Sequence, residues 1–184
     1  MPYPAQVNAE TILDRTRTLI ADEGSDGLSL ARLAEALGIT APSLYRYYKS
    51  KTELLRAVHL TTQQQLTQTM LAARQDSATP YERMLAMARA YRAYALAQPV
   101  LYRLAFADVD VSGDAEALLA LALPLQSALE DYAGSADSLA HLRGLWALVH
   151  GFVSLEIGGR FQRGGSLDAD FERAVTAYLR GLTS

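Results

Sequence analysis

A short segment toward the end of the N-terminal third concentrates side chains that bind anions or nucleobases, namely Arg46, Tyr47, Lys49 and Lys51. A guanidinium can bond the edge of a guanine base, and ammonium or hydroxyl groups can bond backbone phosphates. From Thr40 to Arg56 there are four basic residues and one acidic residue, a local charge of +3 in a chain whose total is -3. This concentration favours contact with nucleic acid, and a solvated polar face is the alternative.

Two short helices joined by a tight turn are predicted to position these side chains. Ser29 is a favourable N-cap, and leucines then recur with helical spacing up to Leu37. Gly38 follows at once, where a left-handed C-cap is expected to end the first helix. Pro42 falls in the first turn of the second helix, where its missing N–H costs little. Leu44 and Tyr48 lie one helical turn apart, and we expect both to be buried.

The sequence G-I-T-A-P-S-L-Y-R-Y-Y-K-S-K-T-E-L-L, which begins at Gly38, resembles the recognition-helix signature of TetR-type transcriptional regulators. The similarity extends roughly over residues 8 to 60. It implies a three-helix DNA-binding domain in a homodimer, with the second helix of the helix-turn-helix entering the major groove of a palindromic operator. The residues expected to contact DNA are Ser29, Thr40, Ala41, Pro42, Ser43, Arg46, Tyr47, Lys49 and Lys51.

Composition limits the classes of protein that need to be considered. A chain of 184 residues that is half hydrophobic can bury one good core with a small extra module. It has no cysteine, which excludes disulfides and thiolate metal sites. The N-terminus lacks an apolar run, and the longest uncharged apolar stretch, 144–155, is shorter than the roughly 18 residues of a membrane span. We therefore expect a cytoplasmic protein.

The pattern of caps and apolar stripes predicts an all-α chain of about nine helices. Asn8 is expected to cap the first helix. A capping box at Ser50–Glu53 opens a linking helix over 51–75, which joins a DNA-binding domain, 1–52, to a ligand-binding and dimerisation domain, 53–184. Its polar tract, Thr61–Thr69, is expected to be exposed. A second capping box, Thr79–Glu82, opens the next helix, which Pro99 ends.

Two further signals lie in the C-terminal half. Pro124 interrupts a leucine-rich helix predicted over about 114–132, so a kink or a break is expected there. Asp168 is expected to cap the last helix.

The sequence L-W-A-L-V-H-G-F-V-S-L-E, with Trp146, His150 and Gly151, resembles the C-terminal domain named for its Trp-His-Gly signature. The similarity extends roughly over residues 80 to 182. It implies a pocket for a small, hydrophobic or aromatic ligand, whose binding would release a repressor from its operator. Without the resemblance, a packed core better explains the isolated His150 and the stripe formed at helical spacing by Met84, Met87, Tyr91 and Tyr94. The residues expected to line the pocket are Met87, Tyr91, Tyr94, Tyr102, Phe106, Trp146 and His150.

The last two predicted helices carry more apolar surface than one core can bury. The helix over about 137–157 is apolar on two faces, and the final helix has its own apolar stripe. This surplus predicts a symmetric four-helix interface between two subunits. The residues expected at this interface are Leu148, Phe152, Leu155, Phe171, Val175, Tyr178 and Leu179.

No residue pattern points to catalysis or to a bound metal. His59, His141 and His150 lack the spacing of metal-ligand pairs, and no phosphate-binding glycine loop or nucleophile elbow occurs. We therefore expect no enzyme activity, no cofactor and no metal, and the expected partners are operator DNA, a small effector and a second copy of the chain. The alternatives are a helical small-molecule carrier or enzyme without operator binding, and a helical adaptor with a different protein partner.

Overall fold

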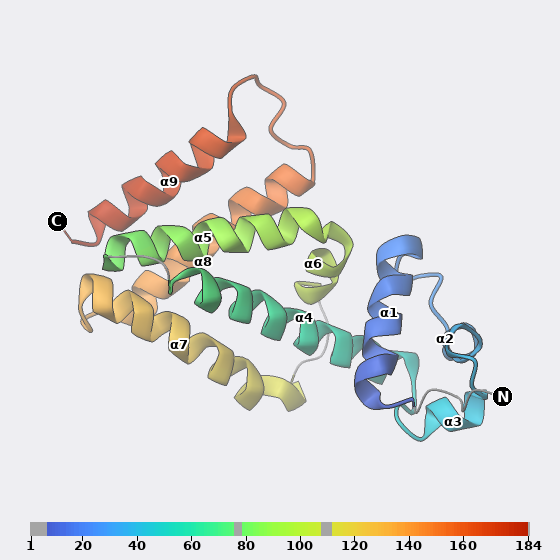
Figure 1. The fold of residues 1–184 in the computed structure, drawn as a ribbon. Helices are drawn as coiled ribbons and strands as arrows, with labels where there is room; N and C mark the ends of the chain where they lie inside the picture. Colours follow the sequence, from blue (N-terminus) through green and yellow to red (C-terminus); the bar gives the residue numbers. More distant parts are fainter. Residues whose placement is uncertain (1–6, 76–78, 108–111, 184) are drawn as a thin grey trace. The chain divides into compact units, whose positions relative to one another are not determined.

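The computed structural model describes residues 7–75, 79–107 and 112–183. Within these residues all regular structure is helical, as predicted (Figure 1). The elements are α1 (Ala9–Glu23), α2 (Leu30–Leu37), α3 (Ala41–Tyr45), α4 (Lys51–Ala73), α5 (Pro80–Ala97), α6 (Pro99–Ala105), a 3-10 turn η1 (Ser112–Asp114), α7 (Ala115–Ala133), α8 (Ser138–Ile157) and α9 (Leu167–Gly181).

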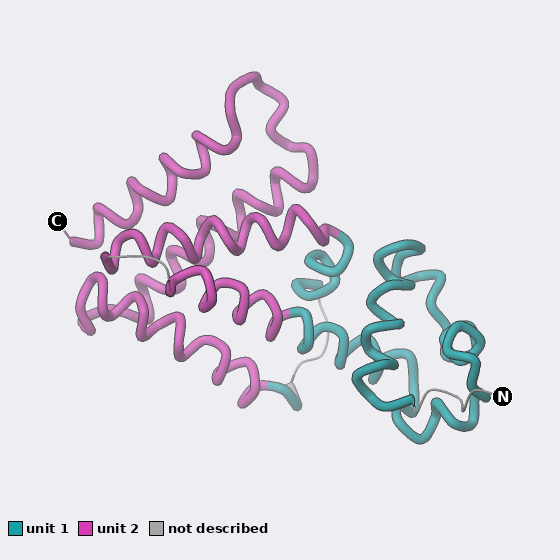
Figure 2. Tube along the Cα trace, in the orientation of Figure 1, with its two compact units in different colours: residues 1–62, 100–114 teal, residues 63–99, 115–184 magenta. Residues whose placement is uncertain are grey.

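The chain divides into two compact units (Figure 2). Unit 1 consists of Met1–Thr62 and Val100–Asp114, and unit 2 consists of Gln63–Pro99 and Ala115–Ser184. Helix α4 contributes its first half to unit 1 and its second half to unit 2. Nearly all of α6 belongs to unit 1, although the helices on either side of it in the sequence, α5 and α7, belong to unit 2.

The core of unit 1 is built from one apolar face of each of its helices. Ile12 of α1, Leu33 of α2, Leu44 of α3 and Leu54 of α4 are fully buried, and Leu101 of α6 packs in the same cluster. Burial of each such side chain stabilises the fold by roughly 1.5–3 kcal/mol relative to exposure. The short helix α3 is therefore held by tertiary contacts, because five residues cannot form a stable helix alone.

Local caps fix where the helices of unit 1 begin and end. The side chain of Asn8 accepts a hydrogen bond from the backbone N–H of Thr11 (2.8 Å), and the Ser29 hydroxyl accepts one from the N–H of Arg32 (3.2 Å). Gly38 adopts the left-handed conformation, with φ of 67°. These three predictions are confirmed: Asn8 and Ser29 cap the starts of α1 and α2, and Gly38 ends α2 at the turn that leads to α3.

The start of α4 differs in detail from the predicted capping box. The Ser50 hydroxyl accepts a hydrogen bond from the N–H of Glu53 (3.1 Å), as predicted. The Glu53 carboxylate, however, accepts its bond from the N–H of Lys49 (2.8 Å) and not from that of Ser50. The carboxylate thus also orders the backbone that leads into α4.

Unit 2 is organised around α5, which packs against α7, α8 and α9. The predicted capping box is present at its start, where Thr79 and Glu82 bond each other's backbone N–H groups. Its inward side buries Met84, Met87 and Tyr91. Pro99 follows directly after the C-cap Gln98 and opens α6.

Three sequence predictions about the helices are wrong in part. Helix α7 continues through Pro124 without a break, since a proline removes only one hydrogen bond of the ladder. The N-cap of α9 is Ser166, whose side chain accepts a bond from the N–H of Ala169 (3.3 Å), while Asp168 lies in the first turn. The tract Thr61–Thr69 is not an exposed stretch, because Thr62 and Thr67 are buried.

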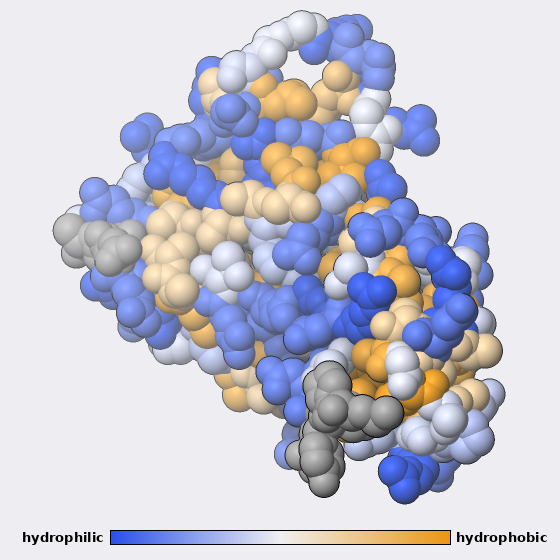
Figure 3. Space-filling model, turned by 45° about the vertical axis from the view of Figure 1, so that its right-hand side comes forward, coloured by the Kyte–Doolittle hydropathy of each residue, from blue (hydrophilic) through white to orange (hydrophobic). Residues whose placement is uncertain are grey.

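The surface shows how apolar groups are distributed on one face. In Figure 3 hydrophilic residues predominate, and hydrophobic residues form several separate groups. No helix of the described residues is long and apolar enough to cross a membrane.

Candidate functional site

The outer side of α3 and the turn after it form the first candidate site. Thr40, Pro42, Arg46 and Lys49 are exposed, whereas Leu44 and Tyr48 point inward and are buried, as predicted. Ala41, Ser43 and Lys51 are half-buried. We call the surface formed by Thr40, Pro42, Tyr45, Arg46, Tyr47 and Lys49 the α3 face.

Some of the predicted DNA contacts also have partners inside unit 1. The Tyr47 hydroxyl donates to the carbonyl of Val7 (2.8 Å), and the Lys51 ammonium donates to the carbonyl of Asp26 (3.4 Å). The Thr40 and Ser43 hydroxyls bond each other (2.9 Å), so Thr40 does not cap α3 with its side chain. These bonds hold the polar groups in place around the exposed Arg46.

Tyr45 is a member of the α3 face that the sequence prediction omitted. Its side chain is 50% exposed, the most of any aromatic residue described. Tyr45 is the last residue of α3 and follows the buried Leu44, so its side chain is turned away from the core.

The residues predicted to line a ligand pocket are divided between the two units. Met87, Tyr91 and Tyr94 lie in the packed interior of unit 2. The Tyr91 hydroxyl is 3.1 Å from Nδ1 of His150, and the Tyr94 hydroxyl donates to the Gln65 side chain (3.4 Å). Burial lowers the pKa of His150, which favours a neutral imidazole at this position.

The other two aromatic residues of that prediction belong to unit 1. Tyr102 is 2% exposed, and its ring lies 4.9 Å from that of Phe106, measured between centroids. The same part of unit 1 holds an ion pair between Arg56 of α4 and Asp114 of η1 (2.5 Å). Burial lowers the pKa of His59, and a hydrogen bond to the Leu104 backbone partly opposes that shift.

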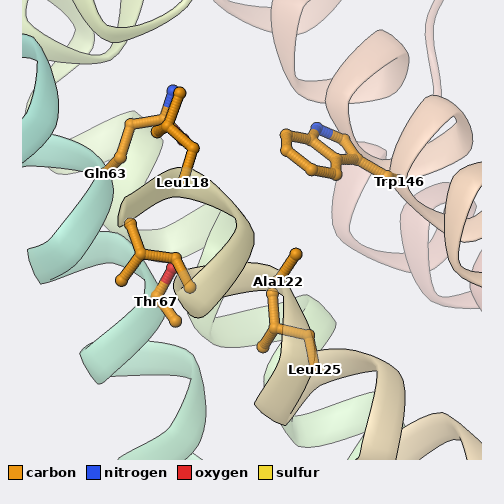
Figure 4. A pocket seen from close by; sticks show the side chains of 7 residues that line it. Gln63, Thr67, Leu118, Ala122, Leu125 and Trp146 are labelled. Atoms are coloured by element: carbon orange, nitrogen blue, oxygen red, sulfur yellow. The ribbon is translucent and has the colours of Figure 1, made fainter. Parts of the chain in front are cut away.

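A cavity of about 110 Å³ lies elsewhere in unit 2, between α4, α7 and α8 (Figure 4). Trp146 is its one wall residue that the sequence prediction named. The others were missed because leucine-rich helices look like core in sequence, and Gln63 and Thr67 lie in the tract expected to be exposed. The walls are formed by Gln63, Thr67, Leu118, Leu121, Ala122, Leu125 and Trp146.

The structure places most of the predicted dimerisation residues inside the subunit. Phe171, Val175 and Leu179 of α9 are at most 2% exposed. The Tyr178 hydroxyl donates to the carbonyl of His141 (2.9 Å), and Phe152 packs against the ring of Phe171 (5.2 Å between centroids). Of that set, Leu155 remains exposed, and Leu148 is half-buried.

A charged group that the sequence did not single out, Arg92, fastens α9 to the rest of unit 2. Its guanidinium donates to both carboxylate oxygens of Glu156 (2.6 and 2.7 Å) and pairs with Asp168 (2.7 Å). It also lies over the ring of Phe171, 5.3 Å from the centroid. Glu156 therefore has a structural role as the partner of Arg92. The hydrogen bonds that Arg92 donates to the carboxylates of Glu156 and Asp168 raise the pKa of Arg92.

The described residues include no group of three or more metal-binding side chains. Unit 1 does present a short surface helix, α3, which carries hydroxyl groups and is followed by the basic residues Arg46 and Lys49. A helix and a tight turn precede it. This is the arrangement of a helix-turn-helix protein that binds DNA.

Comparison with known proteins agrees with that class. A model of bacterial regulatory proteins of the tetR family matches residues 12–58, and a model of the tetracyclin repressor-like C-terminal domain matches residues 84–178. The chain therefore belongs to the TetR family of DNA-binding transcriptional regulators.

Individual relatives support this assignment. An uncharacterized HTH-type transcriptional regulator of Mycobacterium tuberculosis is 34% identical over 162 residues, which cover 85% of this chain and 73% of that protein. A second uncharacterized HTH-type regulator, from Bacillus subtilis, is 28% identical over 93% of this chain and 90% of its own length. The tetracycline repressor of class D from Escherichia coli is 41% identical over 54 residues, 29% of this chain and 25% of that protein.

Solved structures share the fold. A protein of unknown function from Rhodococcus has a TM-score of 0.85 over the whole of both chains, at 24% identity. The structure of a TetR variant from Acinetobacter baumannii in complex with minocycline has a TM-score of 0.68, covers 96% of each chain and is 18% identical. At these identities the likeness concerns the fold alone.

Proposed function

We propose that this protein is a transcriptional repressor that binds a palindromic operator as a homodimer and leaves it when a small molecule binds unit 2. The observation that carries the proposal is the α3 face, which places an exposed Arg46 among exposed hydroxyl and ammonium groups. The proposal includes no catalytic step, and the protein acts through two binding equilibria.

On the α3 face, each type of side chain has its own role in DNA binding. Arg46 reads a base, because its guanidinium can form two bonds to guanine in the major groove. Lys49 and the hydroxyls of Thr40 and Tyr45 bind phosphates, which fix the position of α3 on the duplex. In a dimer the two copies of α3 enter successive major grooves about 34 Å apart.

The distribution of charge suits a reader of specific sites. The segment from Thr40 to Arg56 carries +3, although the chain as a whole carries -3. An acidic protein does not coat DNA nonspecifically, and few basic groups mean few phosphate contacts. We therefore expect a modest salt dependence of operator binding.

For the dimer contact we propose the outward side of α8. Its exposed residues Ala140 and Ala147 are small, and Leu155 nearby is 46% exposed. Small side chains allow two helices to approach closely, and a two-fold axis would pair the same side of α8 from both subunits. The apolar stripe of α9 is already buried within its own subunit, so α8 is the better candidate.

Helix α4 is the element that can transmit the effector signal. It runs unbroken from Lys51 in unit 1 to Ala73 in unit 2, and Gln63 and Thr67 on it line the cavity of unit 2. The Acinetobacter baumannii TetR is known in complex with minocycline, which supports small-molecule binding in a related fold. An inducer must bind the DNA-incompetent state more tightly than the operator-bound state.

The test is selection of fragmented genomic DNA by the purified protein, followed by sequencing. The wild type should enrich a palindrome, and Arg46→Ala should enrich it more weakly and with a relaxed preference at one position of each half-site. Arg160→Ala is the matched control, because Arg160 is an exposed arginine of the loop between α8 and α9 in unit 2. Failure of the wild type to enrich any sequence at low salt would refute operator binding.

A further inference from the structure

The cavity of unit 2 has walls of distinct character (Figure 4). Helix α7 contributes an apolar wall of Leu118, Leu121, Ala122 and Leu125. The indole of Trp146 projects from α8 toward the cavity, and it is 41% exposed. Helix α4 contributes the two polar side chains, Gln63 and Thr67. A ligand in this cavity would lie between aliphatic groups and an aromatic ring, with its polar contacts on α4.

The wall chemistry selects against charged ligands. None of the seven wall residues carries a charge at neutral pH. A carboxylate or ammonium group that lost its water shell here would find no opposite charge, which is strongly unfavourable. The occupant is therefore neutral.

The size of the cavity suits about one ring. A volume of about 110 Å³ is somewhat smaller than the roughly 150 Å³ of an apolar cavity that holds benzene. Pockets for drug-sized ligands are several times larger, about 300 to 1,000 Å³. Most of a multi-ring antibiotic or a long acyl chain would lie outside this cavity and gain little burial from it.

The two polar residues of the cavity wall can orient one polar substituent of the ligand. Gln63 and Thr67 are four residues apart on α4, so their side chains lie on the same side of the helix. The amide of Gln63 can donate and accept, and the Thr67 hydroxyl can do both as well. A hydroxyl or amide on the ligand can therefore point toward α4 while its ring contacts Trp146 and the leucines.

We propose that the effector of this protein is a neutral, single-ring aromatic compound with one hydroxyl or amide substituent, and that it binds between α4, α7 and Trp146. This inference rests on the proposed function in one respect, namely that the ligand regulates DNA binding. Binding of the ligand itself can be measured without DNA. Gln63 is the first residue of α4 in unit 2, so the ligand contacts the helix one residue beyond unit 1. The ligand thus acts directly on the helix that the DNA-binding unit shares.

The experiment uses the intrinsic fluorescence of Trp146, which is the single tryptophan of the chain. Wild-type protein is titrated with phenol, and with benzoate, toluene and minocycline as probes of charge, hydrogen bonding and size. We expect a saturable change with phenol, binding roughly 3- to 10-fold weaker with toluene through loss of one hydrogen bond, and no saturable change with benzoate or minocycline.

Variants then locate the site. Ala122→Phe fills the cavity and should abolish the phenol response, whereas Ala120→Phe, on the exposed side of the same helix, should retain it. Thr67→Val keeps the shape of the side chain and should lower the affinity for phenol to that for toluene. Helicity and the unfolding midpoint confirm that each variant is folded, and Leu121→Phe replaces Ala122→Phe if that variant does not fold.

The result that overturns the inference is the absence of phenol binding, an equal response in Ala122→Phe, or tighter binding of benzoate than of phenol. Operator release is measured on the same variants to separate this inference from the proposed function. If cell extract releases the operator equally from wild type and from folded Ala122→Phe, the repressor function stands and this cavity is not the effector site. If phenol binds as expected but no operator exists, the cavity stands and the repressor function fails.

Discussion

The α3 face and the cavity of unit 2 differ in the charge and polarity of their side chains. The α3 face consists mainly of exposed basic and hydroxyl groups supported by a buried Leu44, while the cavity has mostly apolar walls, two uncharged polar residues and no charge. The +3 of the segment from Thr40 to Arg56 leaves -6 for the rest of the chain, since the total is -3. Under the proposed function, this difference would let one chain bind a polyanion and a neutral small molecule at separate surfaces.

Both regions are held by bonds between residues distant in sequence. Around the α3 face the Tyr47 hydroxyl donates to the carbonyl of Val7, and Lys51 donates to that of Asp26. In unit 2, Tyr178 donates to the carbonyl of His141, and Arg92 pairs with Glu156. The two regions therefore differ in the groups they expose and not in how they are held.

The largest expected effect is in the core behind the α3 face. Leu44 is fully buried, so Leu44→Ala should lower the free energy of unfolding by about 2–5 kcal/mol through lost burial and a cavity. The matched control is Leu119→Ala, because Leu119 is 60% exposed and should cost less than about 0.5 kcal/mol. Urea unfolding followed by circular dichroism measures both, and equal costs would show that α3 is not held by this core.

A smaller effect is expected for the ion pairs of unit 2. Arg92→Ala leaves the Glu156 carboxylate poorly solvated and without its guanidinium, which should cost about 2 kcal/mol of unfolding free energy. Arg89 pairs with Glu172 on the open surface, so Arg89→Ala should cost at most about 1 kcal/mol. The same urea titration compares them, and a larger loss for Arg89→Ala would contradict the assigned roles.

On the α3 face itself, two substitutions should separate base reading from phosphate binding. Arg46→Ala should cost about 1–3 kcal/mol of binding free energy and relax the preference at one operator position. Lys49→Ala should weaken binding to all DNA sequences alike. It should also reduce the salt dependence of binding by about one phosphate contact. Anisotropy titrations at several salt concentrations test this, and an unchanged base preference in Arg46→Ala would exclude it as the reader.

The smallest expected effect is a dependence of stability on pH. Burial lowers the pKa of His59 and of His150, so below the ordinary value of about 6.5 the unfolded chain binds more protons than the folded one. The free energy of unfolding should fall as the pH drops from 7.5 to 5.5, by at most about 1.4 kcal/mol per pH unit for each group. Urea midpoints at both values measure it, and His150→Gln should reduce the slope. A free energy of unfolding that rises as the pH falls would contradict the expected direction.

Much of unit 1 could be predicted from sequence because its signals are local. Ser29, Gly38 and Pro42 act through their own backbone geometry, so their spacing alone predicted the two helices and the turn. Helical spacing also predicts that Leu44 and Tyr48 are buried, and both are. The exposure of Tyr45, which follows Leu44 in the same helix, is consistent with that spacing although the sequence prediction did not include it.

Unit 2 was harder to predict because its cavity and its contacts are set by tertiary packing. Gln63 and Trp146 are far apart in sequence, and no spacing rule relates them. Apolar periodicity predicted α8 and α9 but could not tell which stripe faces the subunit's own core, so Phe171, Val175 and Leu179 were assigned to a dimer contact. Arg92 resembles any helical arginine until its partners on α8 and α9 are known.

The most direct test of the account is one pair of titrations on wild type, Arg46→Ala and Ala122→Phe, with labelled operator in one and phenol in the other. We expect Arg46→Ala to bind the operator about 1–3 kcal/mol more weakly and to keep the Trp146 response, while Ala122→Phe binds the operator like the wild type and loses the response. If one variant lost both activities while folded, or if each lost the activity assigned to the other region, the division of work between the α3 face and the cavity would be wrong.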